Sequence, residues 1–203
     1  MSPGVSAAHA GLIAERRDRL RRQLLQLIPP RSAFVWEVGS GHGHFLSAYA
    51  AAHPERLFVG IDIASDRVAR AKRKCDRARL GNLHFFLADD ADFLSAIPDG
   101  AHFAEVFMLF PDPWPKRRHH KNRVMKPEFL TTVAARAGQG ANLYFRTDDE
   151  PYYREAADIV RAHPDWTESE GAPLPFEERT VFQERAQRHF TLVAKRAWDK
   201  KSA

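Results

Sequence analysis

The 203-residue sequence has one cysteine, Cys75, so it offers no pair of thiols for an internal disulfide or a cysteine-based zinc site. It has no apolar run of roughly 18 residues, the length that crosses a bilayer, and we expect no membrane span. The segment from Met1 to Gly11 lacks the charged and then apolar pattern of a signal peptide. Internal repeats, low-complexity runs and linkers are also missing. These absences predict a single domain, over residues 1–203, of a cytoplasmic protein.

The charge is modestly basic, with 31 Lys and Arg against 26 Asp and Glu. It is concentrated in two clusters. The first comprises Arg67, Arg70, Lys72, Arg73, Lys74, Arg77 and Arg79. The second comprises Lys116, Arg117, Arg118, Lys121, Arg123 and Lys126, interleaved with His119 and His120. The first is either a solvated helix face or a contact for a polyanion, and the second favours a nucleic-acid partner. Adjacent histidines without a third ligand favour solvent or phosphate contacts, so we expect no metal.

Strands and helices alternate along the sequence, which predicts an α/β fold. An amphipathic helix over 7–27 ends at Pro29 and Pro30. Strands are predicted at 34–38, 57–63, 83–87, 103–110 and 142–146, and helices at 45–52, 64–80, 127–137 and 150–162. Such βα units form a mainly parallel sheet with helices on both faces. Two late strands, 166–169 and 190–195, have no helix between them and predict a closing antiparallel pair.

Glycines and carboxylates follow the first three predicted strands, where open α/β sheets bind ligands. The residues concerned are Glu37, Gly39, Gly41, Asp62, Asp89 and Asp90. An acid ending the second strand suits ribose hydroxyls, and an acid beside the glycines suits a cation. The G-x-G-x-G spacing differs from that of dinucleotide binders, whose pyrophosphate needs a free helix N-terminus. The site therefore favours S-adenosylmethionine, which carries an amine and a sulfonium but no phosphate.

The most specific segment follows the fourth strand and reads Phe110-Pro111-Asp112-Pro113-Trp114-Pro115-Lys116. Prolines on both sides of Asp112 fix φ and stiffen the loop, so the carboxylate has a defined place beside the cofactor. Trp114 either supports this loop or stacks on a base. With the basic residues that follow, the segment resembles the F-P-D-P-W-x-K-x-R-H-x-K-R-R pattern of bacterial tRNA (guanine-N7)-methyltransferases. Further matches at 37–43, 60–62, 147–148 and 180–182 extend the resemblance from about residue 34 to the end.

The resemblance implies a class I methyltransferase fold, a Rossmann-like three-layer sandwich whose mostly parallel seven-stranded sheet has an antiparallel C-terminal strand. Its parts would be an N-terminal helix (1–30), a cofactor-binding βα core (31–162) and C-terminal substrate-side strands (163–203). The implied reaction moves a methyl group from S-adenosylmethionine, leaving S-adenosylhomocysteine, to N7 of a tRNA guanosine, expected at position 46 in the variable loop. The implied enzyme is a monomer or a homodimer.

Individual roles follow from the same resemblance. Asp112 is expected to be the catalytic carboxylate and a cofactor contact, and counting from Asn82 favours Asp89 over Asp90 on the adenine side. The expected substrate contacts are Lys116, Arg117, Arg118, Lys121, Arg123, Asp148, Thr180 and Gln183. Asp148 could instead, or also, cap the helix that begins near Glu150.

Two positions depart from the family pattern. Gln183 stands where the family has an acid, and Asn122 replaces a cation, which puts the contacts of the tail in question. Three alternatives compete: a nicotinamide-dependent oxidoreductase, a non-catalytic RNA-binding module, and a methyltransferase acting on a protein or small molecule. The glycine spacing and Glu37 disfavour the oxidoreductase. The retained acids disfavour the non-catalytic module, and the basic loop disfavours a protein or small-molecule acceptor.

Overall fold

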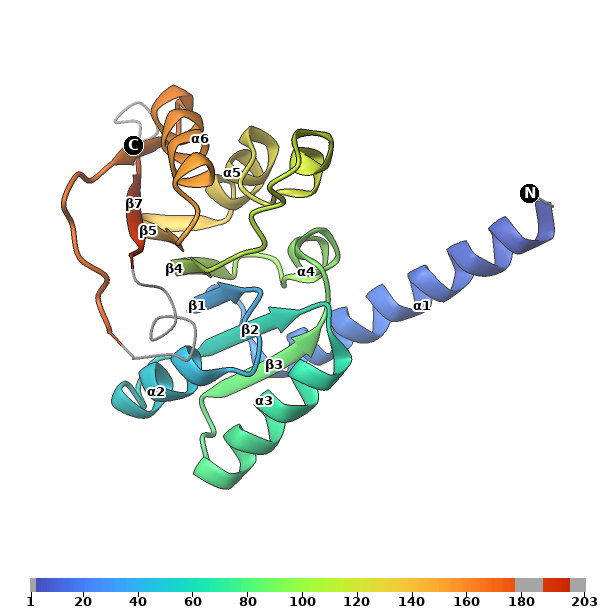
Figure 1. Cartoon of the computed structure of the whole chain (residues 1–203). Helices are drawn as coiled ribbons and strands as arrows, with labels where there is room; N and C mark the ends of the chain where they lie inside the picture. Colours follow the sequence, from blue (N-terminus) through green and yellow to red (C-terminus); the bar gives the residue numbers. More distant parts are fainter. Residues whose placement is uncertain (1–2, 178–187, 198–203) are drawn as a thin grey trace.

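The computed structural model describes residues 3–177 and 188–197, with one sheet in the order β3-β2-β1-β4-β5-β7-β6 (Figure 1). The strands are β1 (Ala33–Val38), β2 (Phe58–Asp62), β3 (Leu83–Leu87), β4 (His102–Leu109), β5 (Ala137–Thr147), β6 (Trp166–Glu168) and β7 (Phe190–Arg196). Strands β1 to β5 pair in parallel, whereas β7 is antiparallel to both β5 and β6. Among the described strands β7 alone is therefore reversed, which confirms the predicted sheet.

Helices cover both faces of the sheet. They are α1 (Pro3–Leu27), α2 (His44–Ala52), α3 (Ser65–Ala78), α4 (Asp90–Ala96), α5 (Pro127–Ala134) and α6 (Glu150–Ala162), with a 3-10 helix η1 (Arg117–Asn122). Two buried clusters place α1, α4, α5 and α6 on one face and α2 and α3 on the other. The three-layer arrangement is thus confirmed. Figure 1 shows α1 running outward from the sheet, with its N-terminal end farthest from it. Within the described ranges no helix is long and apolar enough to cross a membrane.

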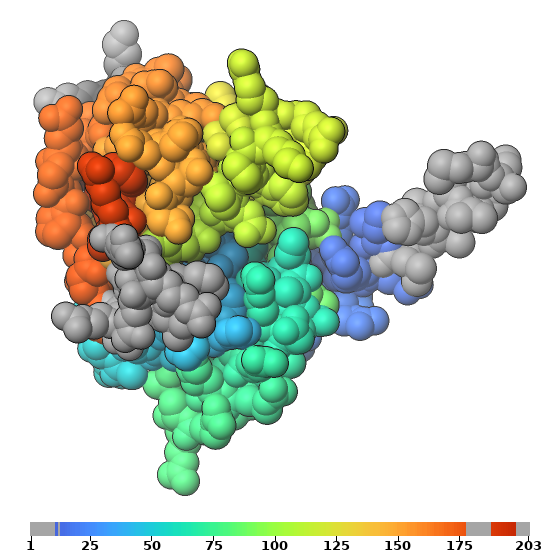
Figure 2. All heavy atoms as spheres, in the orientation of Figure 1, coloured from blue at the N-terminus to red at the C-terminus, as the bar shows by residue number. Residues whose placement is uncertain are grey.

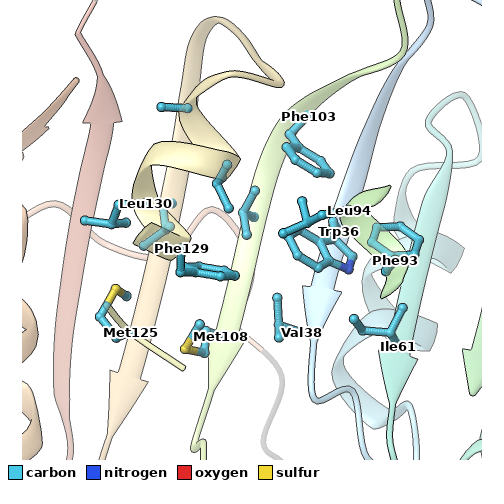
Figure 3. Close-up of a cluster of buried hydrophobic side chains, with 14 of the residues drawn as sticks. Trp36, Val38, Ile61, Phe93, Leu94, Phe103, Met108, Met125, Phe129 and Leu130 are labelled. Carbon is cyan, nitrogen blue, oxygen red and sulfur yellow. The ribbon is translucent and has the colours of Figure 1, made fainter. Parts of the chain in front are cut away.

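Aromatic rings pack among aliphatic side chains in the larger cluster, on the face of the sheet covered by α4 and α5 (Figure 3). Trp36 on β1 is fully buried and stacks on Phe93 of α4 and Phe103 of β4, with ring centroids 5.0 and 4.9 Å apart. Burial of this much aromatic surface, together with the stacking, favours one fixed position of α4 against β1 and β4. The core therefore anchors the carboxyl end of β1, where the first glycine of the turn follows.

The structure differs from the predicted elements most clearly at α4 and at the junction of α5 and β5. Helix α4 was not predicted, although Asp89 caps it by accepting a hydrogen bond from the Asp92 backbone N–H at 2.7 Å. Helix α5 ends at Ala134 rather than at Ala137, and β5 already begins at Ala137. The early start comes from pairing of Phe103 with Ala137, a tertiary contact that overrides the weak strand propensity of this glycine-containing segment.

Candidate active site

The sheet order reverses direction between β1 and β4. From β1 the chain proceeds outward to β2 and β3 on one side, and it continues with β4 and β5 on the other. In an open α/β sheet, the crevice at such a switch point, outside the carboxyl ends of the strands, is the usual ligand site. The glycine turn follows β1, Asp62 ends β2, and the segment with Asp112 follows β4. The topology therefore brings the predicted cofactor and reaction segments to one edge of the sheet.

The glycines of the turn have two different tasks. Gly39, Gly41 and Gly43 all have positive φ values, of 70°, 55° and 67°. A Cβ atom at Gly43 would lie 2.5 Å from the Phe85 ring, so this glycine permits close packing of the turn on β3. A Cβ atom added at Gly39 or at Gly41 would have no neighbouring atom within 4 Å. Their backbone therefore borders open space, as the approach of a cofactor requires.

Glu37, two residues before Gly39, has a buried carboxyl group. Its residue is 4% exposed, and its Oε2 atom has no hydrogen-bond partner among the described residues. Burial, and secondarily the neighbouring charge of Asp62, raises the pKa of Glu37 to about 8. Ser40 Oγ is likewise buried without a partner. Unsatisfied buried oxygens are costly, and a bound cation or donor would satisfy them. The residues present therefore fit the cationic amino-acid end of S-adenosylmethionine.

Asp62 holds the turn in shape. Its Oδ2 atom accepts a hydrogen bond from the Gly41 N–H at 2.9 Å, and its Oδ1 atom accepts one from the Ala64 N–H at 2.8 Å. The Arg67 guanidinium lies 3.9 Å from Oδ2. Each carboxylate oxygen can accept a second hydrogen bond, so these contacts leave capacity for ribose hydroxyls. Asp62 thus has a structural role that the sequence analysis did not include.

The acids after β3 lie at the start of α4. Asp89 is the N-cap of the helix, and its Oδ2 atom lies 3.9 Å from the Arg16 guanidinium of α1. Asp90 is half-buried, and this burial raises its pKa. Arg16 and Arg17 both pair with the buried Asp92, at 2.9 and 2.5 Å. Helix α1 is therefore tied to the adenine side of the predicted cofactor site.

The loop after β4 carries Asp112 on a strained and braced backbone. Asp112 itself is exposed, and the nearby Phe110 and Trp114 have φ values of 52° and 46°. Positive φ is unfavourable for such bulky residues and persists only where surrounding contacts impose it. One such contact is the hydrogen bond from the Phe110 N–H to the Arg146 carbonyl at 2.7 Å, which continues the pairing of β4 with β5.

Arg123 differs from the expectation of an exposed phosphate contact. Its residue is 2% exposed, and its Nε–H donates to the Pro113 carbonyl oxygen at 2.8 Å. The guanidinium also pairs with Glu155 and lies 4.5 Å from the centroid of the Tyr152 ring, both on α6. A buried arginine with these partners is not free to bind a phosphate. Arg123 instead fastens the proline-rich loop to α6.

The remaining predicted substrate residues are surface groups. Lys116, Arg117, Arg118 and Lys121 are exposed on or beside η1. Asp148 is exposed as well, and the cap of α6 is its neighbour Asp149, which accepts the Tyr152 N–H at 2.8 Å. The alternative that Asp148 caps this helix is therefore wrong. Thr180 and Gln183 lie outside the described residues.

Sequence reasoning missed three residues that shape the site. Ser40 stands between two glycines of the turn, and nothing in the pattern distinguishes its buried Oγ from an exposed one. Glu155 is the partner of Arg123 and is 32 residues away in the sequence. Asp92 could have been found from the Asp-Asp-Ala-Asp-Phe-Leu segment, which has an acidic helix start before two apolar residues.

Comparisons with known proteins agree with this geometry. Residues 31–194 match a protein family described as "Putative methyltransferase". A tRNA (guanine-N(7)-)-methyltransferase of Alkalilimnicola ehrlichii is 37% identical over 165 residues, covering 78% of this chain and 68% of the relative. The enzyme of the same name from Rhodospirillum rubrum is 35% identical over 159 residues, covering 75% and 62%. The chain thus spans 62% to 68% of the length of these two relatives.

Solved structures show the same fold at low identity. An rRNA methylase from Streptococcus thermophilus matches with a TM-score of 0.57 and 11% identity, over 90% of this chain and 94% of that one. An O-methyltransferase from Thermotoga maritima, described as dependent on S-adenosylmethionine, matches with a TM-score of 0.56 and 13% identity, over 92% and 66%. These similarities confirm the predicted class of fold.

Proposed function

The chain belongs to the tRNA (guanine-N(7)-)-methyltransferase family, and we propose that it transfers a methyl group from S-adenosylmethionine to N7 of a guanosine in tRNA. The observation that carries the proposal is the pairing of β1 with β4. It joins the strand that ends at Glu37 and Val38 to the strand that leads into the braced loop with Asp112, which supports a shared site at their carboxyl ends. A tRNA substrate implies that the reaction takes place in the cytoplasm.

The cofactor end of the site binds by charge and by shape. When bound, S-adenosylmethionine supplies an electrophilic methyl group on a sulfonium. Glu37 would hold its amine, and Asp62 its ribose hydroxyls. The Asp89 and Asp90 segment would contact the adenine side, with Asp89 favoured as the contact. The backbone at Gly39 and Gly41 leaves room for the ligand.

The reaction itself is mainly a positioning problem. Guanine N7 has an available lone pair, so no general base is required. Attack by N7 needs in-line approach to the methyl group, which a rigid site secures by holding both reactants in one orientation. Positive charge then develops on the imidazole part of the base, and a fixed carboxylate beside it favours that charge. Asp112 is the proposed carboxylate, because its loop has flanking prolines and is fastened by Arg123.

The exposed cations next to Asp112 would bind the RNA. Lys116, Arg117, Arg118 and Lys121 lie on or directly before η1 and are exposed, so they are available to phosphates. Binding through such contacts weakens steeply as salt rises, because it releases condensed counterions. Asp148, Thr180 and Gln183 remain proposed contacts of the base or the RNA. The proposed target is the guanosine at position 46 in the variable loop.

The test combines product mapping with one variant. Purified protein is incubated with methyl-labelled S-adenosylmethionine and unmodified tRNA, and the product is cleaved at 7-methylguanosine. We expect a single cleavage at the variable loop. Asp112→Ala should keep its affinity for S-adenosylhomocysteine but lose on the order of a hundredfold or more in turnover.

Asp99→Ala is a matched control, because Asp99 is exposed in the turn that precedes β4. It should leave turnover unchanged. Absence of label in tRNA across several salt concentrations would overturn the proposed substrate. Unchanged turnover in Asp112→Ala would remove this residue from its proposed role.

A further inference from the structure

A stripe of cations lies along one side of α3, close to the glycine turn. This α3 stripe consists of Arg70, Arg73, Lys74 and Arg77. The spacing i, i+3, i+4, i+7 places these residues on one side of the helix, whereas Val68, Ala71 and Cys75 pack inward. With His42 and His44 the stripe lines a cleft of 360 Å³. The described residues that line this cleft are all cationic or imidazole side chains.

The stability of α3 does not explain the stripe. Like charges three and four residues apart repel each other and destabilise a helix. Within residues 3–177 and 188–197, Arg70, Arg73 and Arg77 form no ion pair. Of the nearby acids, Asp76 lines a separate cavity between α1 and α3. Three neighbouring arginines without an ion-pair partner among the described residues are typical of a surface that binds a polyanion.

The cleft is fixed in position beside the proposed cofactor site. Lys74 Nζ donates a hydrogen bond to the backbone oxygen of His42 at 3.1 Å, which ties α3 to the glycine turn. The rings of His42 and His44 lie 6.3 Å apart, at an angle of 76°. The anion that enters the cleft would therefore sit next to the turn that borders the cofactor.

The α3 stripe and the basic loop flank the crevice on opposite sides. Helix α3 follows β2 and the basic loop follows β4, while β1 with its glycine turn lies between these strands. Figure 2 shows α3, in teal and green, and the yellow-green segment around 116–126 on the same face of the molecule. One folded RNA can thus contact both surfaces while a base reaches the crevice between them.

We propose that the α3 stripe is a second RNA-binding surface, which holds backbone phosphates of the tRNA away from the guanine that reacts. The inference rests on the proposed function for the identity of the RNA. It separates two tasks: the basic loop places the base beside Asp112, and the α3 stripe sets the orientation of the rest of the RNA. Phosphate contacts of this kind fix register without reading sequence.

The test is the salt dependence of tRNA binding by the triple variant Arg70→Gln, Arg73→Gln and Arg77→Gln. The dissociation constant is measured by fluorescence anisotropy with labelled, unmodified tRNA between about 50 and 200 mM salt. Each phosphate contact contributes roughly 0.7 to 0.9 to the slope of log affinity against log salt. We expect the slope to become shallower by about 2 to 3, with affinity reduced roughly ten- to a hundredfold at low salt. The matching Arg→Lys triple variant should keep the wild-type slope, because it keeps the charge.

A control variant removes as much charge from the side of the sheet where the parallel strands begin, away from the crevice. Arg31→Asn, Arg161→Gln and Lys195→Gln combine three exposed cations before β1, at the end of α6 and on β7. Asparagine is chosen for Arg31 because it tolerates the positive φ of 62° found there. This control should bind tRNA within about twofold of the wild type. Affinity for S-adenosylhomocysteine should be equal in all variants and serves as the check on folding.

The outcomes separate this inference from the proposed function. If the α3 variant matches the wild type in slope and affinity, or the control loses as much affinity as the α3 variant, the second surface is refuted. In either case, methylation of tRNA by the wild type leaves the proposed function standing. If the wild type binds tRNA through the α3 stripe but never methylates it, the surface stands and the proposed function falls.

Discussion

Replacing Glu37 by glutamine should make the protein more stable while weakening its binding of the methyl donor. The side chain is a buried carboxyl whose pKa is raised to about 8, compared with 4.5 as its ordinary value in an unfolded chain. Between these values the unfolded chain carries a charge at this position that the folded protein does not. Folding therefore takes up a proton, and stability falls as pH rises through this window.

The size of the effect follows from the two pKa values. Each pH unit above 4.5 costs the folded state about 1.4 kcal/mol, until the folded pKa is reached near pH 8. At pH 7 the accumulated cost is about 3 kcal/mol. Glutamine has nearly the same shape but no ionisable proton, so Glu37→Gln removes this cost. Such a gain is a large fraction of the net stability of a typical domain.

The measurement is urea-induced unfolding of wild type and variant at pH 5, 6, 7 and 8. We expect the difference in unfolding free energy to increase in favour of Glu37→Gln by about 1.4 kcal/mol per pH unit, reaching about 3 kcal/mol at pH 7 relative to its value near pH 4.5. Glu170→Gln, a change at an exposed carboxylate, is the matched control and should show no such trend. A stability difference that stays constant from pH 5 to pH 8 would show that the folded protein does not hold Glu37 protonated.

Glu37→Gln also tests whether the carboxylate binds the methyl donor. A hydrogen bond to a charged group contributes about 1.5 to 3 kcal/mol, so loss of the carboxylate should weaken binding of S-adenosylhomocysteine at least about tenfold. Stability and ligand affinity should therefore change in opposite directions. Retention of wild-type affinity would show that Glu37 does not hold the amine of the ligand.

Three further predictions concern the same site. Affinity for S-adenosylhomocysteine should rise about tenfold per pH unit below pH 8 and then level off, because binding requires Glu37 to lose its proton; calorimetry should record proton release. Arg123→Met should lower kcat about a hundredfold and leave S-adenosylhomocysteine affinity within about threefold, because the loop loses its hydrogen bond at Pro113. Arg123→Lys should not restore kcat, since lysine lacks the planar guanidinium with its fixed N–H donors. Gly43→Ala should lower the free energy of unfolding by about 3 kcal/mol, because the new Cβ atom would clash with the Phe85 ring and φ is positive. Gly39→Ala should lower it by about 1 kcal/mol, through the positive φ alone, and should chiefly weaken ligand binding.

Each of these has an outcome that contradicts it. A pH-independent affinity would mean that the carboxyl at Glu37 is already ionised in the free protein. Equal losses of kcat and of ligand affinity in Arg123→Met would indicate general unfolding rather than a displaced loop. If Gly39→Ala and Gly43→Ala were equally destabilising, the distinction between open and packed glycines would be wrong.

The order and type of most elements could be predicted from local sequence. Strand β3 and helix α6 have the predicted bounds, because apolar periodicity and turn residues define them within a few residues. The positions of Glu37, Asp62 and Asp112 at strand ends could also be predicted, because parallel strands bring their carboxyl ends to one edge. By contrast, α4 is short and is held by tertiary contacts such as the packing of Phe93 on Trp36, which no local pattern contains.

The residues alone were enough to infer the alternation of strands and helices, the side chains at the strand ends, and the family. Which charges are surface groups and which are buried depends on how the chain packs in three dimensions. Arg123 belongs to the same basic run as Lys121, yet it is covered because Tyr152 and Glu155 on α6 pack against it. The raised pKa of Glu37 also depends on packing, because the side chain on β1 is buried by its neighbours and lies near Asp62 on β2. Dielectric surroundings and partners distant in sequence are properties of the folded chain, and residue type alone does not encode them.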